Sequence, residues 1–322
     1  MKALVARRPD AQFSAVVQRD AVGQLPAGVR AHVRPVSAGI TRAALGMLPV
    51  SGADLVHGLD VDLPLATRAV TVATVHDMSV FDVPWASSRL RATGERRLLS
   101  TALRHADVLI ADSQFTADRV AVISGRRCVV IPLAPAPWAL PPSATDVARV
   151  RAVYQLPESF LLQVGSVEPR KDVALVAAAA RELGLACVLA GAGSDGADAP
   201  VGVHGLGYVD VGDLPGLYGA ATVVAYASRY EGFGLPPLEA MACGGVVVAS
   251  RVGALPAVVG DGAVLVPRHS LDAWVVALRP LIADPVERAQ LGARAVAAAA
   301  ELSWTATAAS TLQAYRDAGV AV

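Results

Sequence analysis

The segment from Tyr226 to Ser250 constrains the fold of this chain more than any other. The apolar, β-branched run at 222–226 is typical of a buried strand. A glycine-containing loop follows, and the two prolines at 236–237 predict a helix start, where a missing amide hydrogen costs nothing. That helix is expected to end at Gly244, and residues 246–249 to form the next strand. This order predicts a parallel sheet with the loop at the carboxyl end of a strand, where such sheets bind ligands.

Two carboxylates, Glu231 and Glu239, bracket this loop. Free amides at a helix start favour an anion such as phosphate, so the carboxylates are expected to serve other parts of a ligand. Ribose or sugar hydroxyls are suitable partners because they donate hydrogen bonds to a carboxylate. The spacing alone slightly favours a simpler interpretation, in which the helix dipole stabilises Glu239 and Glu231 is a solvated loop residue.

Residues 231–244 have the sequence EGFGLPPLEAMACG, which resembles the Glu-x7-Glu signature of retaining family 4 glycosyltransferases of the GT-B fold. The resemblance implies an α/β protein in which two Rossmann-like, parallel-sheet domains face each other across a cleft. It also implies that Glu231 contacts the transferred sugar and that Glu239 holds the ribose of a nucleotide donor. Phe233 and Gly234 are then expected to offer backbone amides to the donor diphosphate.

Segment 164–171, VGSVEPRK, leaves a predicted strand and enters a predicted helix. Cations oppose the helix dipole at that end, so a merely solvated pair is the weaker interpretation. The segment resembles the Gly-x-x-Glu-Pro-Arg-Lys motif of the same family. The resemblance implies that the donor diphosphate is bound by Gly165, Ser166, Arg170 and Lys171. Fixed cations at that position would stabilise the charge that grows on the leaving diphosphate.

Four further positions are candidates for the site. His76 follows the strand-like run 71–75 and precedes Asp77. The family has a His-Asp step there, which implies that His76 contacts the transferred sugar; His57 is a weaker candidate. Tyr208 and Val209 resemble the family segment that borders the nucleobase. A strand with an aromatic side chain in its core explains that segment about as well.

The length of 322 residues fits two α/β cores better than one. Strand-like and helix-like runs alternate along the chain, and the proline-rich stretch IPLAPAPWALPP predicts a stiff linker. The expected division is an amino-terminal Rossmann-like domain at 1–138 and a donor-binding domain at 143–302. The resemblance implies that the first domain binds the acceptor and that a last helix, within 303–322, packs back on it.

The first ten residues depart from the family pattern. They resemble the end of the first helix in relatives, so the first strand and the glycine-rich loop of that domain are expected to be lacking. The alternative is that residues 2–6 are themselves the first strand. A misassigned start or a truncation is the hypothesis, and an in-frame upstream start codon would support it.

Composition narrows the cellular setting. There is no uncharged apolar run of about 18 residues, so no membrane-spanning helix is expected. Arg7, Arg8 and Asp10 argue against a signal peptide. The three cysteines are odd in number and far apart, which favours a reducing cytoplasm and simple core roles. The Asp60-Val61-Asp62 step matches a metal-binding Asp-x-Asp by chance in a Gly/Pro-bounded loop, so no metal is expected.

A predicted helix at 89–105 carries five arginines: Arg89, Arg91, Arg96, Arg97 and Arg104. Such a face is usually only solvated. The alternative is that it contacts anionic lipid or a lipid-phosphate acceptor, which would make the protein peripheral to the inner face of the membrane. No nucleic-acid partner is expected.

The function expected from these observations is retaining, metal-independent transfer of a hexose from a nucleotide-diphosphate sugar to a glycan or a lipid-linked acceptor. Mannose from GDP-mannose is a guess by analogy, and no further cofactor is expected. Two alternatives stay open. The chain could bind the donor without turnover as a partner subunit, or it could be a sugar-nucleotide epimerase on the same fold. A phosphorylase is disfavoured, since those of this fold carry pyridoxal phosphate on a lysine near the carboxyl terminus, and the last lysine here is Lys171.

Overall fold

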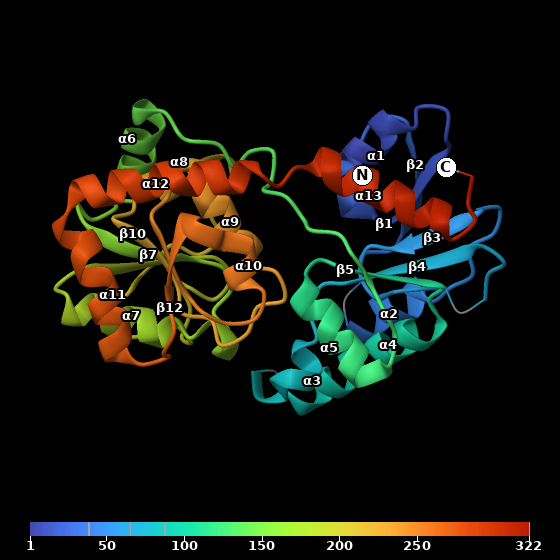
Figure 1. The fold of residues 1–322 in the computed structure, drawn as a ribbon, viewed down its shortest axis with the longest axis horizontal. Coiled ribbons are helices and arrows are strands. Elements are labelled where there is room, and N and C mark those ends of the chain that lie inside the picture. Colours follow the sequence, from blue (N-terminus) through green and yellow to red (C-terminus); the bar gives the residue numbers. More distant parts are fainter. Residues whose placement is uncertain (38, 65, 87, 322) are drawn as a thin grey trace. The chain divides into compact units, whose positions relative to one another are not determined.

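The structure is a computed structural model that describes residues 1–37, 39–64, 66–86 and 88–321. The chain divides into two compact units (Figure 1). Unit 1 comprises Met1–Leu133 and Ser303–Val322, and unit 2 comprises Ala134–Leu302. The division therefore falls inside the proline-rich stretch, slightly before the predicted end of the first domain at 138.

Unit 1 is built on parallel strands with helices between them. Its elements in chain order are α1 (Lys2–Arg7), β1 (Phe13–Gln18), β2 (Val29–Arg34), α2 (Gly39–Gly46), β3 (Leu55–Gly58), β4 (Val70–Val75), α3 (Ser79–Asp82), α4 (Arg89–His105), β5 (Val108–Ala111), α5 (Gln114–Ser124), β6 (Val129–Val130) and α13 (Trp304–Asp317). One sheet pairs β1 with β2, and a second has the order β3-β4-β5-β6. The interpretation of residues 2–6 as a strand is wrong, because they form α1.

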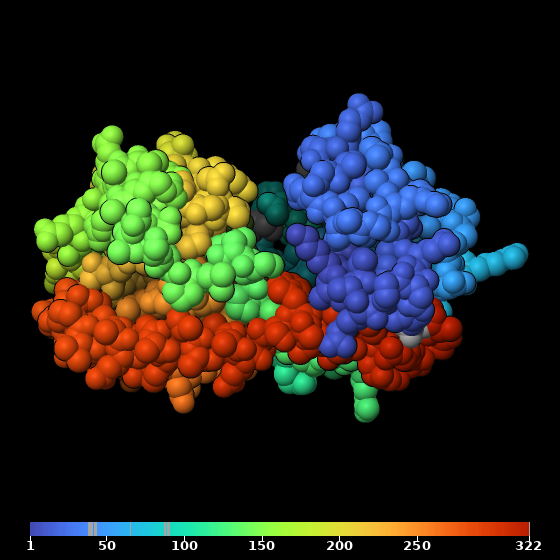
Figure 2. All heavy atoms as spheres, turned by 90° about the horizontal axis from the view of Figure 1, so that it is seen from above, coloured from blue at the N-terminus to red at the C-terminus, as the bar shows by residue number. Residues whose placement is uncertain are grey.

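The last helix of the chain belongs to unit 1. Ser303 caps it by accepting a hydrogen bond from the amide of Ala306, and α13 lies against α1 (Figures 1 and 2). Its apolar residues Leu312 and Tyr315 pack in one cluster with Val72 of β4 and Ile110 of β5. The carboxyl-terminal residues thus complete the core of the amino-terminal unit.

Unit 2 holds the larger sheet, of order β12-β11-β10-β7-β8-β9, with every neighbouring pair parallel. Its elements are α6 (Ala144–Val153), β7 (Phe160–Val164), α7 (Val173–Glu182), β8 (Ala186–Ala190), β9 (His204–Gly205), α8 (Leu214–Ala220), β10 (Val223–Tyr226), α9 (Leu235–Ala242), β11 (Val247–Ser250), α10 (Leu255–Val259), β12 (Ala263–Val266), α11 (Leu271–Ala283) and α12 (Pro285–Ala300). Strand β9 has only two residues, and α6, α8 and α10 were not predicted from the sequence.

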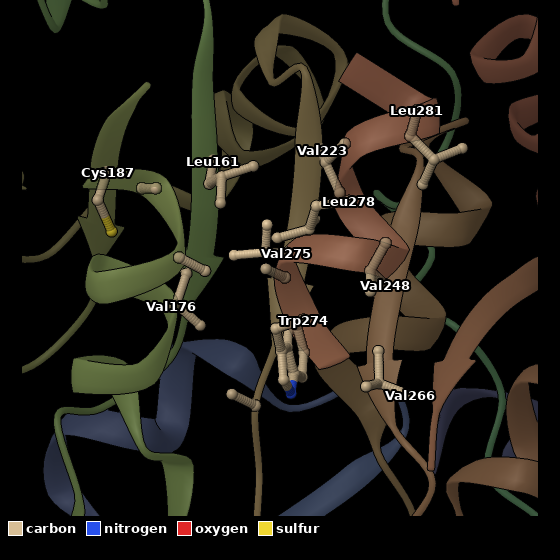
Figure 3. Close-up of a cluster of buried hydrophobic side chains, with 14 of the residues drawn as sticks. Leu161, Val176, Cys187, Val223, Val248, Val266, Trp274, Val275, Leu278 and Leu281 are labelled. Atoms are coloured by element: carbon tan, nitrogen blue, oxygen red, sulfur yellow. The ribbon is translucent and has the colours of Figure 1, made fainter. Parts of the chain in front are cut away.

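The core of unit 2 lies between the sheet and the helices α7 and α11 (Figure 3). Trp274 of α11 is completely buried there, next to aliphatic side chains from β7, β10 and β11. Strands that are covered in this way read as continuous apolar runs, as VVAY of β10 does. The packed sheet fixes the loops at the carboxyl ends of β7 and β10, which carry the polar residues described next.

Candidate functional site

The loop after β7 is shaped by two glycines and a single 3-10 turn. Gly165 has φ +141°, and its carbonyl oxygen lies so close to Gly191 that a Cβ at 191 would be 2.5 Å from it. Residues Pro169–Lys171 form the turn, and the Lys171 amide donates to the Glu168 carbonyl at 2.9 Å. The turn brings two consecutive cationic side chains to the carboxyl end of β7, as the sequence predicts.

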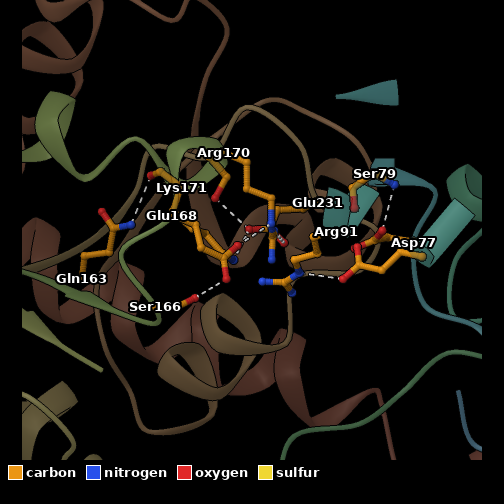
Figure 4. A network of polar contacts seen from close by, with 11 residues as sticks. Asp77, Ser79, Arg91, Gln163, Ser166, Glu168, Arg170, Lys171 and Glu231 are labelled. Carbon is orange, nitrogen blue, oxygen red and sulfur yellow. Dashed lines mark hydrogen bonds and ion pairs between the residues drawn. The ribbon is translucent and has the colours of Figure 1, made fainter. Parts of the chain in front are cut away.

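Lys171 and Glu231 form a buried ion pair (Figure 4). The Lys171 Nζ lies 2.5 Å from Glu231 Oε1, and the side chains are only 8% and 7% exposed. Ser228 Oγ donates to the same oxygen at 2.7 Å, whereas Glu231 Oε2 lies 3.5 Å from Arg170 Nη1. One carboxylate oxygen of Glu231 is therefore held firmly, and the other keeps capacity to accept a further hydrogen bond.

Glu168 is a member of this group that the sequence did not single out. Its Oε1 accepts from Ser166 Oγ at 2.6 Å, and its Oε2 accepts from Arg170 Nε at 2.9 Å. Burial alone would raise the pKa of Glu168, but these hydrogen bonds and the nearby cationic charges outweigh it and lower the pKa. In the sequence, the only indication of this role was that Glu168 lies two residues from both Ser166 and Arg170. The two cations are thus balanced by two carboxylates.

The loop that carries Glu231 is tied to its neighbours through the backbone. The Arg229 amide donates to the Arg170 carbonyl at 2.7 Å, and the Ala254 amide donates to the Glu231 carbonyl at 3.0 Å. A Cβ at Gly253, whose φ is +55°, would overlap that same carbonyl oxygen. Glycine is therefore required for this close approach.

Helix α9 begins directly after this loop. Gly234 is its N-cap residue with φ +102°, and a Cβ there would overlap the Leu255 side chain. The side chain of Phe233 is buried, so only its backbone is suited to contact a ligand. Pro236 and Pro237 have no amide hydrogen, so at this helix start only the Leu235 amide and the helix dipole can favour an anion.

Glu239 lies further along α9, apart from the Lys171–Glu231 pair. It is half-buried, and burial raises its pKa to about 7, although a backbone hydrogen bond from Ala136 lowers it in part. Burial raises the pKa values of Tyr218 and Tyr226, and the charge of Glu239 raises both further. The ribose-binding candidate is thus a carboxyl group whose protonation changes near neutral pH.

The two candidates for the nucleobase region differ in exposure. The side chain of Tyr208 is 88% exposed, and that of the neighbouring Val209 is only 6% exposed. The alternative of an aromatic side chain in the core of a strand is therefore wrong, since Tyr208 follows β9 and faces solvent. An exposed aromatic ring can stack on a planar ligand.

In unit 1, His76 follows β4 and is held by two acceptors. Its Nδ1 lies 2.5 Å from Asp112 Oδ2, and its Nε2 lies 2.7 Å from the Leu59 carbonyl oxygen. Because a carboxylate and a carbonyl can only accept, both ring nitrogens must donate, which requires the imidazolium form. The hydrogen bond to Asp112 outweighs burial and raises the pKa of His76 to about 9.

His57 has a structural role instead. Its Nδ1 lies 2.6 Å from the Tyr315 hydroxyl of α13, and its Nε2 lies 2.8 Å from Thr74 Oγ1. Burial and the charge of His76 lower the pKa of His57 to about 4. It joins the last helix to β3 and β4.

The arginines of α4 do not form one continuous exposed face. Arg91 pairs with Glu95 at 2.7 Å, and Arg96 Nε donates to the Val80 carbonyl at 2.6 Å. Arg97 and Arg104 are exposed, and the side chain of Arg89 lies outside the described residues. In the described parts of the chain, no helix is long and apolar enough to cross a bilayer. Those parts also contain no cluster of three or more His, Cys, Asp or Glu residues arranged to hold a metal ion.

Known proteins resemble this chain in both sequence and structure. It is 32% identical over 281 residues to O-antigen chain mannosyltransferase B of Escherichia coli, a match that covers 81% of this chain and 73% of that protein. It is 34% identical over 285 residues to D-inositol 3-phosphate glycosyltransferase of Actinosynnema mirum, with coverage of 80% and 67%. Residues 149–297 match the family model "Glycosyl transferases group 1".

Solved structures agree on the fold. Sucrose-phosphate synthase from Thermosynechococcus elongatus aligns with a TM-score of 0.70 and 26% identity, covering 84% of this chain and 74% of that one. WaaG, a glycosyltransferase involved in lipopolysaccharide biosynthesis, aligns with a TM-score of 0.71 and 17% identity, with coverage of 99% and 95%. Anabaena Alr3699/HepE in complex with UDP and glucose aligns with a TM-score of 0.74 and 19% identity, with coverage of 98% and 94%. The chain therefore belongs to the group 1 glycosyl transferases of the GT-B fold.

Proposed function

We propose that this chain is a retaining hexosyltransferase that uses a nucleoside-diphosphate sugar as donor. The observation that carries the proposal is the buried Lys171–Glu231 pair with Arg170 beside it, at the carboxyl ends of β7 and β10. A diphosphate needs fixed cations, and a sugar hydroxyl needs an accepting carboxylate oxygen. Both requirements are met within one small group of side chains.

In the proposed reaction, the bond between the anomeric carbon and the diphosphate oxygen breaks, and its electron pair goes to that oxygen. Arg170 and Lys171 would stabilise this growing charge more strongly in the transition state than before it. The same oxygen would take the proton of the acceptor hydroxyl, whose oxygen bonds the anomeric carbon from the face that the diphosphate leaves. Configuration is then retained without a covalent intermediate, and no step requires a metal ion.

The other candidate residues have supporting roles in this proposal. Gly165, Ser166, Phe233 and Gly234 would contact the diphosphate, the first two from the loop after β7 and the others from the start of α9. Glu239 would accept hydrogen bonds from the ribose, while Tyr208 and Val209 would border the base. Glu231 and the His76 imidazolium would contact the transferred sugar.

Mannose is the proposed sugar, and GDP-mannose the proposed donor. The likeness to O-antigen chain mannosyltransferase B supports this choice. The likeness to Alr3699/HepE, whose structure contains UDP and glucose, makes UDP-glucose the main competitor. The proposed acceptor is a glycan or a lipid-linked sugar.

A role at an anionic membrane surface is part of the proposal. It is supported by Arg97 and Arg104 of α4, which are exposed and carry the same charge. Wild-type protein should co-sediment with phosphatidylglycerol vesicles and not with phosphatidylcholine vesicles. The Arg97→Gln/Arg104→Gln variant should lose that binding, and equal binding of both proteins would contradict this role.

The decisive experiment is calorimetric titration of the purified chain with GDP, UDP and ADP, followed by product analysis with the matching sugar nucleotide. We expect one nucleotide to bind at micromolar concentration and Arg170→Gln to weaken that binding by about tenfold, the scale of a charged hydrogen bond. Arg149→Gln, in an ion pair with Asp213, is the matched control. Its nucleotide binding should equal that of the wild type.

Each of the other possible results would lead to a different conclusion about function. Failure to bind any of the three nucleotides would overturn the proposed function. Binding without turnover would indicate a donor-binding partner subunit. Conversion of the sugar nucleotide in the absence of any acceptor would indicate an epimerase.

A further inference from the structure

Asp172 has an unusual backbone conformation directly after Lys171. Its φ is 41° and its ψ is 51°, in the left-handed region, and it is also the N-cap residue of α7. Residues other than glycine adopt this conformation at a cost, although Asp and Asn tolerate it best. The surroundings must therefore hold Asp172 there.

The Asp172 carboxylate contacts three separate segments. Its Oδ1 accepts from the Leu175 amide at 3.3 Å, which caps α7. Its Oδ2 accepts from Arg229 Nη2 at 2.8 Å, from Arg229 Nε at 3.0 Å and from His269 Nε2 at 2.7 Å. Burial would raise the pKa of Asp172, but the hydrogen bonds from His269 and Arg229 outweigh it and lower the pKa. We call Asp172, Arg229 and His269 the Asp172 cluster.

The Asp172 cluster connects the two loops of the candidate site. Asp172 ends the loop after β7, Arg229 lies on the loop after β10, and His269 lies between β12 and α11. Arg229 also donates its amide to the Arg170 carbonyl at 2.7 Å, so the two loops are joined by both backbone and side chain. The Lys171 carbonyl accepts from Gln163 Nε2 at 3.2 Å.

We propose that Asp172 is a positioning residue that sets the separation between the cationic turn, Arg170–Lys171, and the loop that carries Glu231. The expected effect on binding and rate rests on the proposed function, whereas the claim that Asp172 holds the two loops in place does not. Besides the cluster, the turn is joined to the second loop by the Arg229–Arg170 backbone hydrogen bond and by the contacts of Glu231 with Arg170 and Lys171. A shift of about 1 Å in a group that positions substrate can cost about a hundredfold in rate. The cluster would keep both loops in place before a donor arrives.

The test uses substitutions that separate the charge from the backbone. Asp172→Asn keeps a residue that tolerates φ near 41° and can still cap α7, but it removes the charge that Arg229 and His269 contact. His269→Gln keeps a nitrogen donor in a similar place, and His269→Ala removes it. The matched control is Asp213→Asn, because the Arg149–Asp213 pair has side-chain exposures of 48% and 15%, against 49% and 17% for Arg229–Asp172.

Two kinds of measurement are made on the full chain, one of the loops and one of the site. Hydrogen–deuterium exchange of peptides covering 165–172 and 227–234 reports on the loops without any ligand. Calorimetry with GDP and UDP, and initial rates with the matching sugar nucleotide, report on the site. We expect Asp172→Asn to speed exchange in both peptides and to weaken nucleotide binding or lower kcat by about tenfold. His269→Gln should resemble the wild type, His269→Ala should resemble Asp172→Asn in weaker form, and Asp213→Asn should change neither measurement.

Unchanged exchange in both peptides of Asp172→Asn would overturn the proposal. Faster exchange with unchanged nucleotide affinity and unchanged kcat would also overturn it, because the cluster would then serve stability alone. If the wild type binds no nucleotide, the proposed function fails. The exchange data then still determine whether Asp172 holds the two loops together.

Discussion

Two pairs of charged side chains, one in each unit, lie at the carboxyl ends of parallel strands and differ in burial. In unit 2, Lys171 and Glu231 are both almost completely buried, with 8% and 7% of their side chains exposed. In unit 1, Asp112 is equally buried at 2%, but 47% of the His76 side chain is exposed. Both pairs have a contact distance of 2.5 Å.

The difference in burial indicates that the two pairs contribute differently to stability. A buried pair is expensive to break, because either partner alone leaves an uncompensated charge away from water. Lys171–Glu231 is therefore part of the framework as well as part of the site. The exposed ring of His76 contributes less to stability, and its buried partner mainly fixes its orientation and its charge. At these strand ends, unit 2 presents buried charges of both signs, whereas unit 1 presents the accessible imidazolium of His76.

The largest effect is expected on breaking the buried pair. Lys171→Met keeps most of the side-chain volume but removes the nearer cation of the buried Glu231 carboxylate. Because Arg170 stays 3.5 Å from the other oxygen, we expect a loss of about 3 kcal/mol of unfolding free energy, the low end for breaking a buried pair. Urea unfolding followed by circular dichroism measures this loss. The double variant Lys171→Met/Glu231→Leu should lose less than the single one, since no unpaired charge remains.

The control for this prediction is the exposed pair of Arg149 and Asp213. Arg149→Met should cost much less than Lys171→Met, because 48% of the Arg149 side chain is exposed to water. Equal losses in Lys171→Met and Arg149→Met would remove the distinction between buried and exposed pairs.

The sequence predicted the strands of this fold well because their apolar runs are short, β-branched and bounded by turns. The run VTVATV of β4 and the run VVAY of β10 are examples. Helix α8, with the sequence LPGLYGA, was missed because two glycines and its short length obscure the helical pattern. Helix α6 had a detectable signal, the capping box of Ser143 and Asp146.

The residues of the candidate site could be named from the sequence, but the contacts between them could not. Lys171 and Glu231 are 60 positions apart and meet because β10 pairs with β7 in the sheet. The His76–Asp112 pair likewise follows from the neighbouring positions of β4 and β5. Strand order is set by the packing of the whole unit, so local sequence does not contain it. The partners of Asp172 were missed for the same reason.

The next prediction concerns the charge of His76, which depends on its partner Asp112. Asp112→Asn removes the anion that raises the pKa of His76 to about 9, so that pKa should fall toward 6.5, and an NMR titration of the ring protons measures it. In the wild type, the pair contributes its full stability below about pH 6.5. This stability is lost as the pH rises through about 9, the folded-state pKa of His76. Asp112→Asn should abolish that pH dependence. An unchanged pKa would show that Asp112 does not control the charge of His76.

A further prediction concerns Glu239 in unit 2, whose pKa is raised by burial. Its folded-state pKa of about 7 lies above the ordinary 4.5, so the folded state keeps a proton that the unfolded state releases. Its contribution to stability should therefore fall as pH rises from about 4.5 to about 7 and then stay constant. If the ionised form accepts the ribose hydroxyls, nucleotide affinity should rise across the same pKa. Calorimetry at pH 6 and pH 8 measures the change, and Glu239→Gln should remove it; a pH dependence that persists in Glu239→Gln would assign it to another group.

The smallest change in stability is expected at Tyr208, where exposed and buried side chains are adjacent in the chain. Tyr208→Ala should change the unfolding free energy by no more than about 0.5 kcal/mol, because the ring is 88% exposed. Val209→Ala is the matched comparison, and it should cost more because that side chain is only 6% exposed. Calorimetry should give the reverse order for nucleotide binding, since only the ring of Tyr208 is free to stack on a base. If Tyr208→Ala binds the nucleotide as the wild type does, the base lies elsewhere, and exposure at this position has no bearing on the donor.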